Sequence, residues 1–298
     1  MYSVYKPDNL IRLGNDFIWK DNKKVAVIID VAYECWSENN YSGVGPMGNI
    51  LKPGVIDTNA ISWGRYGVVR GIHRLLHILN KHHLRASFMI NGVIAELYPE
   101  DVKKVYEAGH SIHAHSYGMD LVPVYLDEVS EISNIQKTTS AIVSACGYKP
   151  NGWISPRGTK SSNTSRLIID EGYQWHSDAM DDDLPYLEIH PNGQLMAIPF
   201  TMEINDMPHS VRYGNQPEQL ISTFIKTLDW MSSEEPSATL MNFTAHTHVY
   251  GRPAGAVIFD ELIKHALSRN DIWLATRDEI FQYASKFLNE KNLDSKFF

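Results

Sequence analysis

The chain is poor in cysteine and has no long apolar run. Its 298 residues include two cysteines, Cys35 and Cys146, too few for a disulfide framework and not arranged as a Cys-x-x-Cys metal pair. No apolar stretch approaches the ~20 residues of a membrane-spanning helix, and residues 1–8 show no apolar signal core. These absences favour a reducing compartment, and we expect a cytoplasmic protein.

Positive charge is also scarce. The 27 Lys and Arg residues face 35 Asp and Glu residues, which leaves a net charge of −8 with histidine neutral. Proteins that bind nucleic acid carry clustered Lys and Arg, so we expect no nucleic-acid partner and no membrane partner. The apolar content of 43% and charged content of 21% are ordinary for a globular protein, and we expect one domain over residues 1–298.

Short apolar runs alternate with helical patterns along nearly the whole chain. Val25–Tyr33 is short and β-branched, as a buried strand is, and residues 70–84 place apolar side chains at helical spacing. Further strands are predicted at 85–90, 111–116, 153–155, 195–200, 239–246 and 272–275, and further helices at 100–108, 127–146, 162–171, 217–231 and 256–268. The alternation predicts an α/β protein with a mainly parallel sheet, either a barrel or a doubly wound sheet.

One segment, residues 36–65, has no clear period and is rich in Gly, Asn and Ser. A loop of this length inside a compact domain is usually functional, as a lid or a subunit contact, although an irregular surface insertion is an equal alternative. The segment directly follows a candidate catalytic strand, which favours a functional role slightly.

Polar residues recur near the ends of three predicted strands. Side chains two apart on a strand share a face, and the carboxyl ends of parallel strands meet at one edge of the sheet. The three groups are Asp30 with Ala32 and Glu34, His113 with His115, and His246 with His248. They predict a common polar pocket, although most of the 13 histidines are expected to be surface or core residues.

Residues 109–119 (GHSIHAHSYGM) resemble the histidine motif of the polysaccharide deacetylase (NodB-type) superfamily. In that motif, His-[Ser/Gly]-x-x-His, both histidines bind one catalytic metal. His115 stands at the first position and Met119 at the second. A thioether is a poor ligand for Zn²⁺, so the resemblance implies a hydrolase scaffold with an altered metal site.

Other segments resemble the metal-independent allantoinases and cyclic amide hydrolases of the same superfamily. Residues 91–115 are similar to that group's second and third strands, and the group's SDA-x-x-DDLPY, IPYT…NDM and H-x-x-x-x-GRP patterns match residues 177–186, 198–207 and 246–253. The resemblance spans about residues 25–279. It implies a distorted (β/α)7-type barrel, a small-molecule substrate and often a homotetramer.

The resemblance also implies which ligands are missing. The catalytic base of the metal-dependent members falls on Asp30, their metal-binding carboxylate on Ala32 and their second histidine on Met119. A catalytic zinc site needs about three protein ligands, so we expect no metal cofactor. A replacement zinc set of Asp30, His113 and His115 stays open as an alternative.

Hydrolysis of an amide needs an activated water, a stabilised oxyanion and a proton for the leaving nitrogen. Glu34 or Asp30 is the candidate base. His115 and His246 are candidate proton donors, since imidazole titrates near neutral pH. Arg157 stands where, by resemblance, deacetylases carry an arginine that orients the base.

The first motif departs from the allantoinase pattern. That group's pattern resembles NYEEGGE, whereas residues 32–38 read AYECWSE, with Trp36 and Ser37 replacing two glycines. The pocket wall must therefore differ. The change is compatible with the family's reaction type but weakens the case for allantoin as the substrate. Substrate contacts are expected at Tyr33, Trp36, Tyr117, Asp183, His248 and Arg252.

The sequence thus predicts a hydrolase of non-peptide carbon–nitrogen bonds that opens a small cyclic amide, ureide or imide. One alternative is a metal-dependent N-deacetylase of an amino sugar or small N-acyl compound. A second alternative is an inactive homologue that only binds its ligand.

Overall fold

The computed structural model describes residues 9–37, 51–52 and 54–294. Within these ranges the chain forms one ten-stranded mixed sheet. The strands are β1 (Leu10–Arg12), β2 (Val25–Tyr33), β3 (Ser87–Ile90), β4 (Ser111–Ala114), β5 (Gly152–Trp153), β6 (Trp175–His176), β7 (Tyr186–His190), β8 (Gly193–Ala197), β9 (Thr239–His246) and β10 (Ile272–Ala275).

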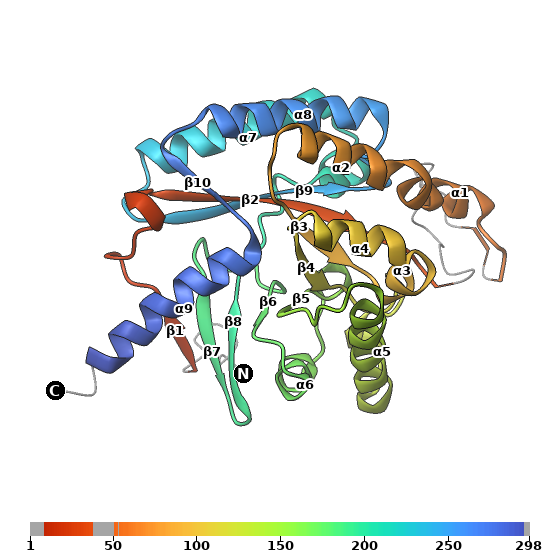
Figure 1. Cartoon of the computed structure of the whole chain (residues 1–298), viewed down its shortest axis with the longest axis horizontal. Helices are drawn as coiled ribbons and strands as arrows, with labels where there is room; N and C mark the ends of the chain where they lie inside the picture. Colours follow the sequence, from red (N-terminus) through yellow and green to blue (C-terminus); the bar gives the residue numbers. More distant parts are fainter. Residues whose placement is uncertain (1–8, 38–50, 53, 295–298) are drawn as a thin grey trace.

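The sheet follows the order β1-β7-β8-β6-β5-β4-β3-β2-β10, with β9 pairing β2 on its other side. All pairs from β9 through to β8 are parallel, and the β8–β7 and β7–β1 pairs are antiparallel. The sheet curls strongly, so that the long strands β2 and β9 lie across the shorter strands β3 to β8 (Figure 1). The carboxyl ends of β2, β4 and β9 therefore meet at one edge of the curl.

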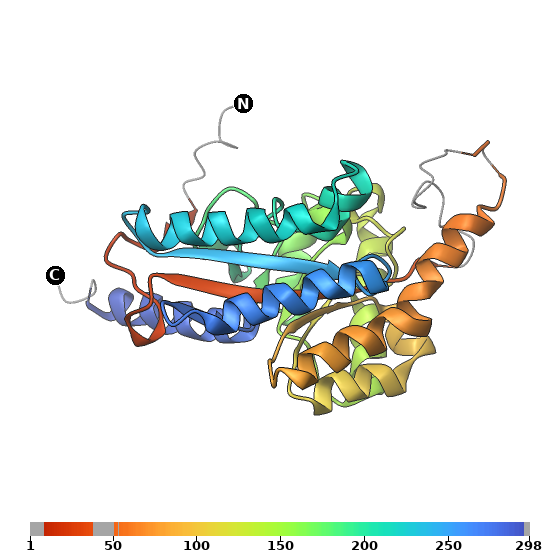
Figure 2. The same cartoon turned by 90° about the horizontal axis from the view of Figure 1, so that it is seen from above.

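The described helices cover the outer side of this curled sheet. They are α1 (Thr58–Tyr66), α2 (Ile72–Lys81), α3 (Gly92–Leu97), α4 (Pro99–Glu107), α5 (Glu128–Cys146), α6 (Thr164–Glu171), α7 (Pro217–Ser233), α8 (Pro253–Ser268) and α9 (Arg277–Asp294), with 3-10 turns at Lys20–Asn22, Pro123–Tyr125 and Pro156–Gly158 and π turns at Gly67–Gly71 and Met207–Arg212. Helices α7 and α8 run along β2 and β9, and α1 extends past their carboxyl ends (Figure 2). No described helix combines the length and apolarity that crossing a bilayer requires.

Helix ends follow the capping signals of the sequence. The Asp127 carboxylate accepts a hydrogen bond from the backbone N–H of Ser130, which caps the first turn of α5. Gly147 ends the helix with a left-handed φ of 72°, a conformation that glycine adopts without strain. The helix predicted over residues 127–146 is thus confirmed to within one residue.

Strand β2 is buried on both faces along its whole length. Val27, Ile29 and Tyr33 on one face pack into the main core beneath the helices. The alternate face points into the curl, where Ala32 joins a smaller apolar cluster. A strand of this kind reads as a continuous apolar run, so Asp30 on its inner face requires a specific partner.

The loop predicted over residues 36–65 is partly wrong. Residues 58–65 belong to α1, which Asp57 caps through the backbone N–H of Ala60 and which buries Trp63. A short helix with few apolar residues leaves only a weak periodic signal, which explains the error. Residues 38–50 and 53 lie outside the described residues. The antiparallel β7–β8 hairpin and helix α9 were not predicted either.

Candidate active site

Glu34 lies between two imidazole rings at the carboxyl edge of the sheet. It directly follows β2, whereas His115 directly follows β4 and His246 ends β9. His115 Nε2 lies 3.1 Å from Glu34 Oε1, and His246 Nε2 lies 3.4 Å from the same oxygen. All three side chains are buried. The structure thus brings together three residues that the sequence nominated from three separate strands.

A backbone carbonyl fixes the orientation of His115. Its Nδ1 lies 2.7 Å from the carbonyl oxygen of Ile154, just after β5. An oxygen acceptor at this distance requires the hydrogen to be on Nδ1, so Nδ1–H donates this bond. The opposite nitrogen, Nε2, therefore faces Glu34 and is the atom of this ring that exchanges a proton with the site.

Asp206 orients His246 in a corresponding way, and sequence reasoning did not nominate it. Its Oδ1 lies 2.5 Å from His246 Nδ1, and its Oδ2 accepts the backbone N–H groups of His246 at 2.8 Å and Tyr250 at 3.1 Å. A bridge between Asn205 and Thr244 of β9 carries this segment alongside the site. The available signal was Asn205-Asp206, which lies inside the segment that resembles the IPYT…NDM pattern, but that pattern did not indicate a role for Asp206.

These contacts determine the charges of the site. Burial alone would lower the pKa of His246, but the carboxylates of Glu34 and Asp206 outweigh it and raise the pKa to about 10. Burial opposes ionisation of Glu34, yet His246 and His115 hold its pKa well below the usual 4.5. Burial raises the pKa of Asp206, an effect that His246 opposes. At neutral pH His246 is an imidazolium that donates toward two carboxylates, and Glu34 is ionised.

Both imidazole contacts of Glu34 use Oε1. The other oxygen, Oε2, makes no hydrogen bond within the described chain. A buried carboxylate oxygen has the capacity to accept at least one hydrogen bond, so Oε2 is the atom available to a water molecule or a substrate N–H.

Asp30 is held elsewhere, although it shares the inner face of β2 with Glu34. Its two oxygens accept from Arg277 Nε at 2.9 Å and from Arg277 Nη2 at 2.7 Å, and both side chains are fully buried. Arg277 Nη1 also donates to Ser177 Oγ at 2.6 Å. Four residues of strand separate Asp30 from Glu34 by about 13 Å. Burial raises the pKa of Asp30, and Arg277 opposes that effect.

Arg157 does not take the base-orienting position that the resemblance implied. It lies in an exposed 3-10 turn with a φ of 61°, and its side chain makes no hydrogen bond or ion pair with any described residue. The arginine that binds Asp30 is Arg277, which begins α9. Sequence reasoning missed Arg277 because it falls at the first turn of a helix that was not predicted.

Two of the three positions that hold the metal in the related pattern carry apolar side chains, and His115 occupies the third. Ala32 packs with Met89, Ile154 and Phe200. The sulfur of Met119 lies 3.7 Å from the Asn91 side-chain nitrogen. Neither side chain supplies a hard donor, so these residues do not fit the catalytic metal of the deacetylase pattern.

The alternative zinc set of Asp30, His113 and His115 is not assembled. Asp30 binds Arg277, while the His113 ring packs 5.1 Å from Trp175 with no hydrogen bond to either ring nitrogen. Across residues 9–37, 51–52 and 54–294, no group of three or more His, Cys, Asp or Glu side chains is placed to hold a metal ion.

Three of the expected substrate contacts cluster beside His246. The His248 ring centroid lies 5.6 Å from that of His246 and 5.5 Å from that of Trp36. Arg252 Nε donates to the His248 carbonyl oxygen at 3.0 Å, and the guanidinium lies 4.1 Å above the Tyr66 ring. Arg252 therefore holds the backbone of His248 in place through its hydrogen bond to the carbonyl oxygen.

The other three expected contacts lie away from Glu34. Tyr33 is on the opposite face of β2 and belongs to the core beneath the helices, because its position differs from that of Glu34 by one residue. The Tyr117 hydroxyl donates to Glu96, and its ring lies 3.6 Å from Lys137 Nζ. Asp183 is exposed, with its pKa raised by partial burial and by Glu235 and Glu203.

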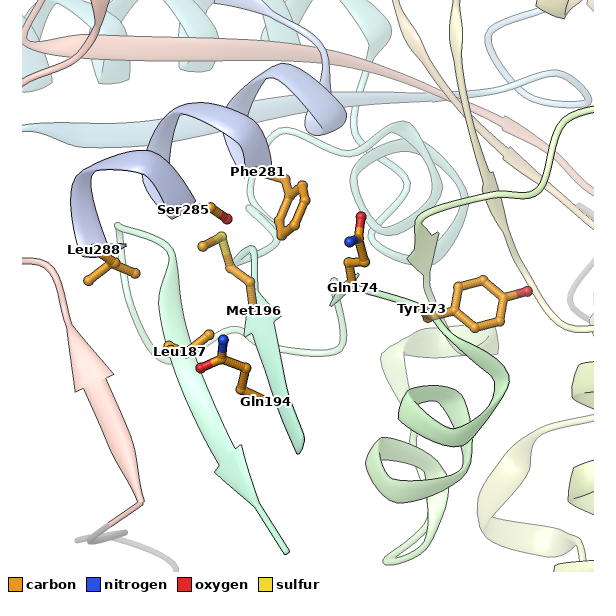
Figure 3. Close-up of a pocket in the computed structure, with 8 residues that line it drawn as sticks. All are labelled: Tyr173, Gln174, Leu187, Gln194, Met196, Phe281, Ser285 and Leu288. Carbon is orange, nitrogen blue, oxygen red and sulfur yellow. The ribbon is translucent and has the colours of Figure 1, made fainter. Parts of the chain in front are cut away.

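A groove of about 290 Å³ opens elsewhere, between α9 and the β7–β8 hairpin (Figure 3). Its lining residues are Tyr173, Gln174, Leu187, Gln194, Met196, Phe281, Ser285 and Leu288. None of them is a histidine or a carboxylate, so the groove lacks the acid–base groups that hydrolysis requires.

The fold and the site define a barrel-type α/β protein with acid–base residues at the carboxyl edge of its sheet. The sequence profile of polysaccharide deacetylases matches residues 66–176. A Schizosaccharomyces pombe protein assigned by name to the polysaccharide deacetylases is 27% identical over 89% of this chain and 91% of its own length. The chain is thus similar to the polysaccharide deacetylases, both in the profile match and along nearly the whole length of this relative.

Solved structures agree with the family. The probable polysaccharide deacetylase of Pseudomonas aeruginosa PAO1 is 26% identical with a TM-score of 0.80 over 89% of this chain and 92% of that chain. The PuuE allantoinase has the same TM-score at 24% identity, over 89% of this chain and 91% of that chain, and shows the shared fold. The predicted distorted barrel is confirmed. The family hydrolyses carbon–nitrogen bonds and also contains pseudoenzymes.

Proposed function

We propose that this protein hydrolyses a carbon–nitrogen bond in a small cyclic amide, ureide or imide, using Glu34 and His246 without a catalytic metal. The observation that carries the proposal is the shared Glu34 oxygen between His115 and His246, with Asp206 behind the second ring. This arrangement supplies a carboxylate acceptor and an imidazolium donor at one point.

The proposed reaction moves two protons. Glu34 Oε2 accepts a proton from water as the water oxygen attacks the amide carbonyl carbon. His115 Nε2, which lies 3.1 Å from the Glu34 carboxylate and therefore carries a hydrogen in this contact, donates that hydrogen bond to the oxyanion that forms. Nε2 of His246 then transfers its proton to the leaving ring nitrogen as the carbon–nitrogen bond breaks. Asp206 keeps the His246 ring oriented throughout, and the product is an open-chain carboxylate.

The strength of the base favours a reactive substrate. Two imidazole partners hold the pKa of Glu34 well below 4.5, which makes it a weak proton acceptor. Ala32 and Met119 offer no ligand set for a Lewis acid that would compensate. A plain acetamide would then react slowly, whereas a strained or electron-poor ring amide needs less assistance. The name of the PuuE allantoinase fits this expectation, since allantoin is a cyclic ureide.

The test is turnover of allantoin, hydantoins, succinimide and dihydropyrimidines by protein that has been exhaustively chelated. We expect ring opening of at least one of these compounds at an undiminished rate. Complete loss of activity after chelation, restored by added zinc, would overturn the metal-independent mechanism.

The names of the S. pombe and P. aeruginosa relatives favour a second candidate, an N-deacetylase of an amino sugar or small N-acyl compound. Acetate release from N-acetylated sugars, measured beside the metal content of the purified protein, separates this candidate from the ring hydrolase. The pseudoenzymes of the family favour a third candidate, an inactive binding protein. Ligand-induced stabilisation without turnover of any amide would support it.

A further inference from the structure

His248 is a buried polar residue that the proposed proton transfers do not use. It lies two residues beyond the end of β9, with its ring centroid 5.6 Å from that of His246 and the two rings at 79° to each other. The ring is fully buried, and neither Nδ1 nor Nε2 has a hydrogen-bond partner. A buried nitrogen without a hydrogen-bond partner destabilises the folded protein, so this arrangement requires a reason.

The ring of His248 is uncharged at neutral pH. Burial lowers its pKa to about 3, and the positive charges of His246 and Arg252 act in the same direction against Glu34. A neutral imidazole carries one N–H donor and one lone pair. His248 therefore carries a neutral donor and a neutral acceptor on a ring whose centroid lies 5.6 Å from that of His246.

The backbone around His248 keeps this ring in place. The π turn that joins α1 to α2 approaches so closely that a Cβ on Gly67 would lie 2.7 Å from Thr247 Oγ1 and 3.2 Å from the His248 Cβ. Arg252 donates to the His248 carbonyl and to the Trp63 carbonyl, at 3.0 and 3.3 Å. The ring is thus fixed rather than free to turn toward solvent for its hydrogen bonds.

Two indole rings cover His248. The Trp63 centroid lies 4.6 Å from that of His248 at 83°, and the Trp36 centroid lies 5.5 Å away at 77°. Both indoles retain a small exposed area, 8% for Trp63 and 7% for Trp36. Displacement of these indoles by a bound ring would uncover the His248 nitrogens.

We infer that His248 contacts the substrate and selects an uncharged ring amide that carries a free N–H or carbonyl beside the scissile bond. The inference rests on the proposed ring-opening function and names the part of the substrate that the site recognises. A neutral imidazole gives no ion pair to a carboxylate, so acidic rings are disfavoured. N-Methylation of the ring removes a donor that His248 is placed to accept.

His113 provides an internal comparison. Its ring is also buried with both nitrogens unpartnered, but it packs against Trp175 and faces the charge of Arg277 rather than Glu34. Lack of a partner alone therefore does not mark a substrate contact. The position of His248 beside His246 is the feature that distinguishes it.

The experiment measures binding in a Glu34→Gln background, which stops hydrolysis. Calorimetric titrations use hydantoin, succinimide and dihydrouracil, each ring N–H compound beside its N-methyl counterpart, and dihydroorotate as the acidic match of dihydrouracil. We expect His248→Phe to weaken binding of the parent rings at least ~10-fold, with little change for the methylated rings. His248→Gln, which keeps a donor and an acceptor, should recover part of the loss.

His110→Phe is the matched control. His110 is another buried neutral histidine, but it precedes β4 at the opposite end of that strand and accepts the Ala86 backbone N–H at 3.1 Å. The control should lower the melting temperature without changing the preference for unmethylated rings.

Two outcomes overturn the inference: no ring of the panel binds, or His248→Phe weakens parent and methylated rings equally. Turnover of the panel by the wild type is measured separately. If the wild type turns over a ring of the panel but His248→Phe does not change the binding of that ring, the role of His248 is rejected and the proposed function stands. Selective binding without turnover would reject the proposed function and leave the role of His248 standing.

Discussion

Two buried carboxylates on the same face of β2 differ in the partners that neutralise them. Asp30 meets a guanidinium in a bidentate pair, with both side chains fully buried. Glu34 meets two imidazoles through a single oxygen and leaves the other oxygen without a protein partner among the described residues. Burial is similar in the two places, so burial does not explain the difference in what they can do.

The chemistry of the partner explains it. A guanidinium stays charged at all accessible pH values and fills both oxygens of Asp30, so that pair has no proton to transfer. An imidazole ring can gain or lose a proton, which a guanidinium cannot. Each of the two rings contacts Glu34 through one nitrogen and a second group, the Ile154 carbonyl or Asp206, through the other. The Asp30 pair is thus suited to holding the sheet together, and the Glu34 cluster to acid–base chemistry.

The largest expected effect comes from removing the charge of Glu34. Glu34→Gln keeps the side-chain volume but abolishes the proton acceptor, so kcat should fall at least ~10³-fold in the ring-opening assay. Far-UV circular dichroism and a cooperative melt serve as the control for folding. Activity within tenfold of the wild type would assign the base to another residue.

Breaking the Asp30 pair should affect stability rather than proton transfer. Arg277→Met leaves the Asp30 carboxylate buried without its partner and should cost about 3–5 kcal/mol of unfolding free energy, measured by urea denaturation. The Asp30→Leu/Arg277→Met double variant buries no charge and should recover most of that loss. A single variant that loses less than about 1 kcal/mol would mean that the pair contributes little to folding.

Asp206→Asn tests the electrostatic half of the comparison. The carboxylate helps to raise the pKa of His246 to about 10, so its removal should lower that pKa. The imidazolium is then lost at lower pH, and the alkaline limb of kcat/KM should move downward, with a fall in kcat of about 10²-fold. An alkaline limb that stays in place would show that His246 is not the proton donor.

The same shift has a consequence for stability. The pKa of His246 is raised from 6.5 to about 10 in the folded protein, so its contribution is fully present below pH 6.5 and is lost as the pH rises toward 10. Urea unfolding of the wild type should therefore show a decline over that window. In Asp206→Asn the decline should be smaller and should end at a lower pH.

Most of the fold could be predicted from the sequence, because buried parallel strands and capped helices leave strong local signals. Val25–Tyr33, Thr239–His246 and Ile272–Ala275 have the predicted bounds. Helix α1 and the β7–β8 hairpin were missed, since each depends on packing against distant segments more than on its own periodicity. The cytoplasmic location and the homotetramer remain predictions.

The site was predictable only in part. Glu34, His115 and His246 could be found because strand periodicity and the edge rule place them together. Asp206 and Arg277 could not, because each acts through a contact with a strand far away in the sequence. The pairing that separates the roles of the two carboxylates is therefore tertiary information.

The smallest expected effect concerns Arg157, which the family resemblance placed beside the catalytic base. Its side chain is exposed and makes no ion pair with the described chain, so Arg157→Ala should change kcat/KM by less than ~2-fold and stability by less than ~0.5 kcal/mol. Arg157→Gly should be as stable or more so, since the backbone φ of 61° favours glycine. A hundredfold loss of kcat/KM in Arg157→Ala, with stability unchanged, would mean that Arg157 closes onto the bound substrate. Glu34 would then pair with Arg157 once substrate is bound, whereas Asp30 pairs with Arg277 already in the free protein. The two sites would differ in whether the arginine contact needs substrate, rather than in the chemistry of the partner.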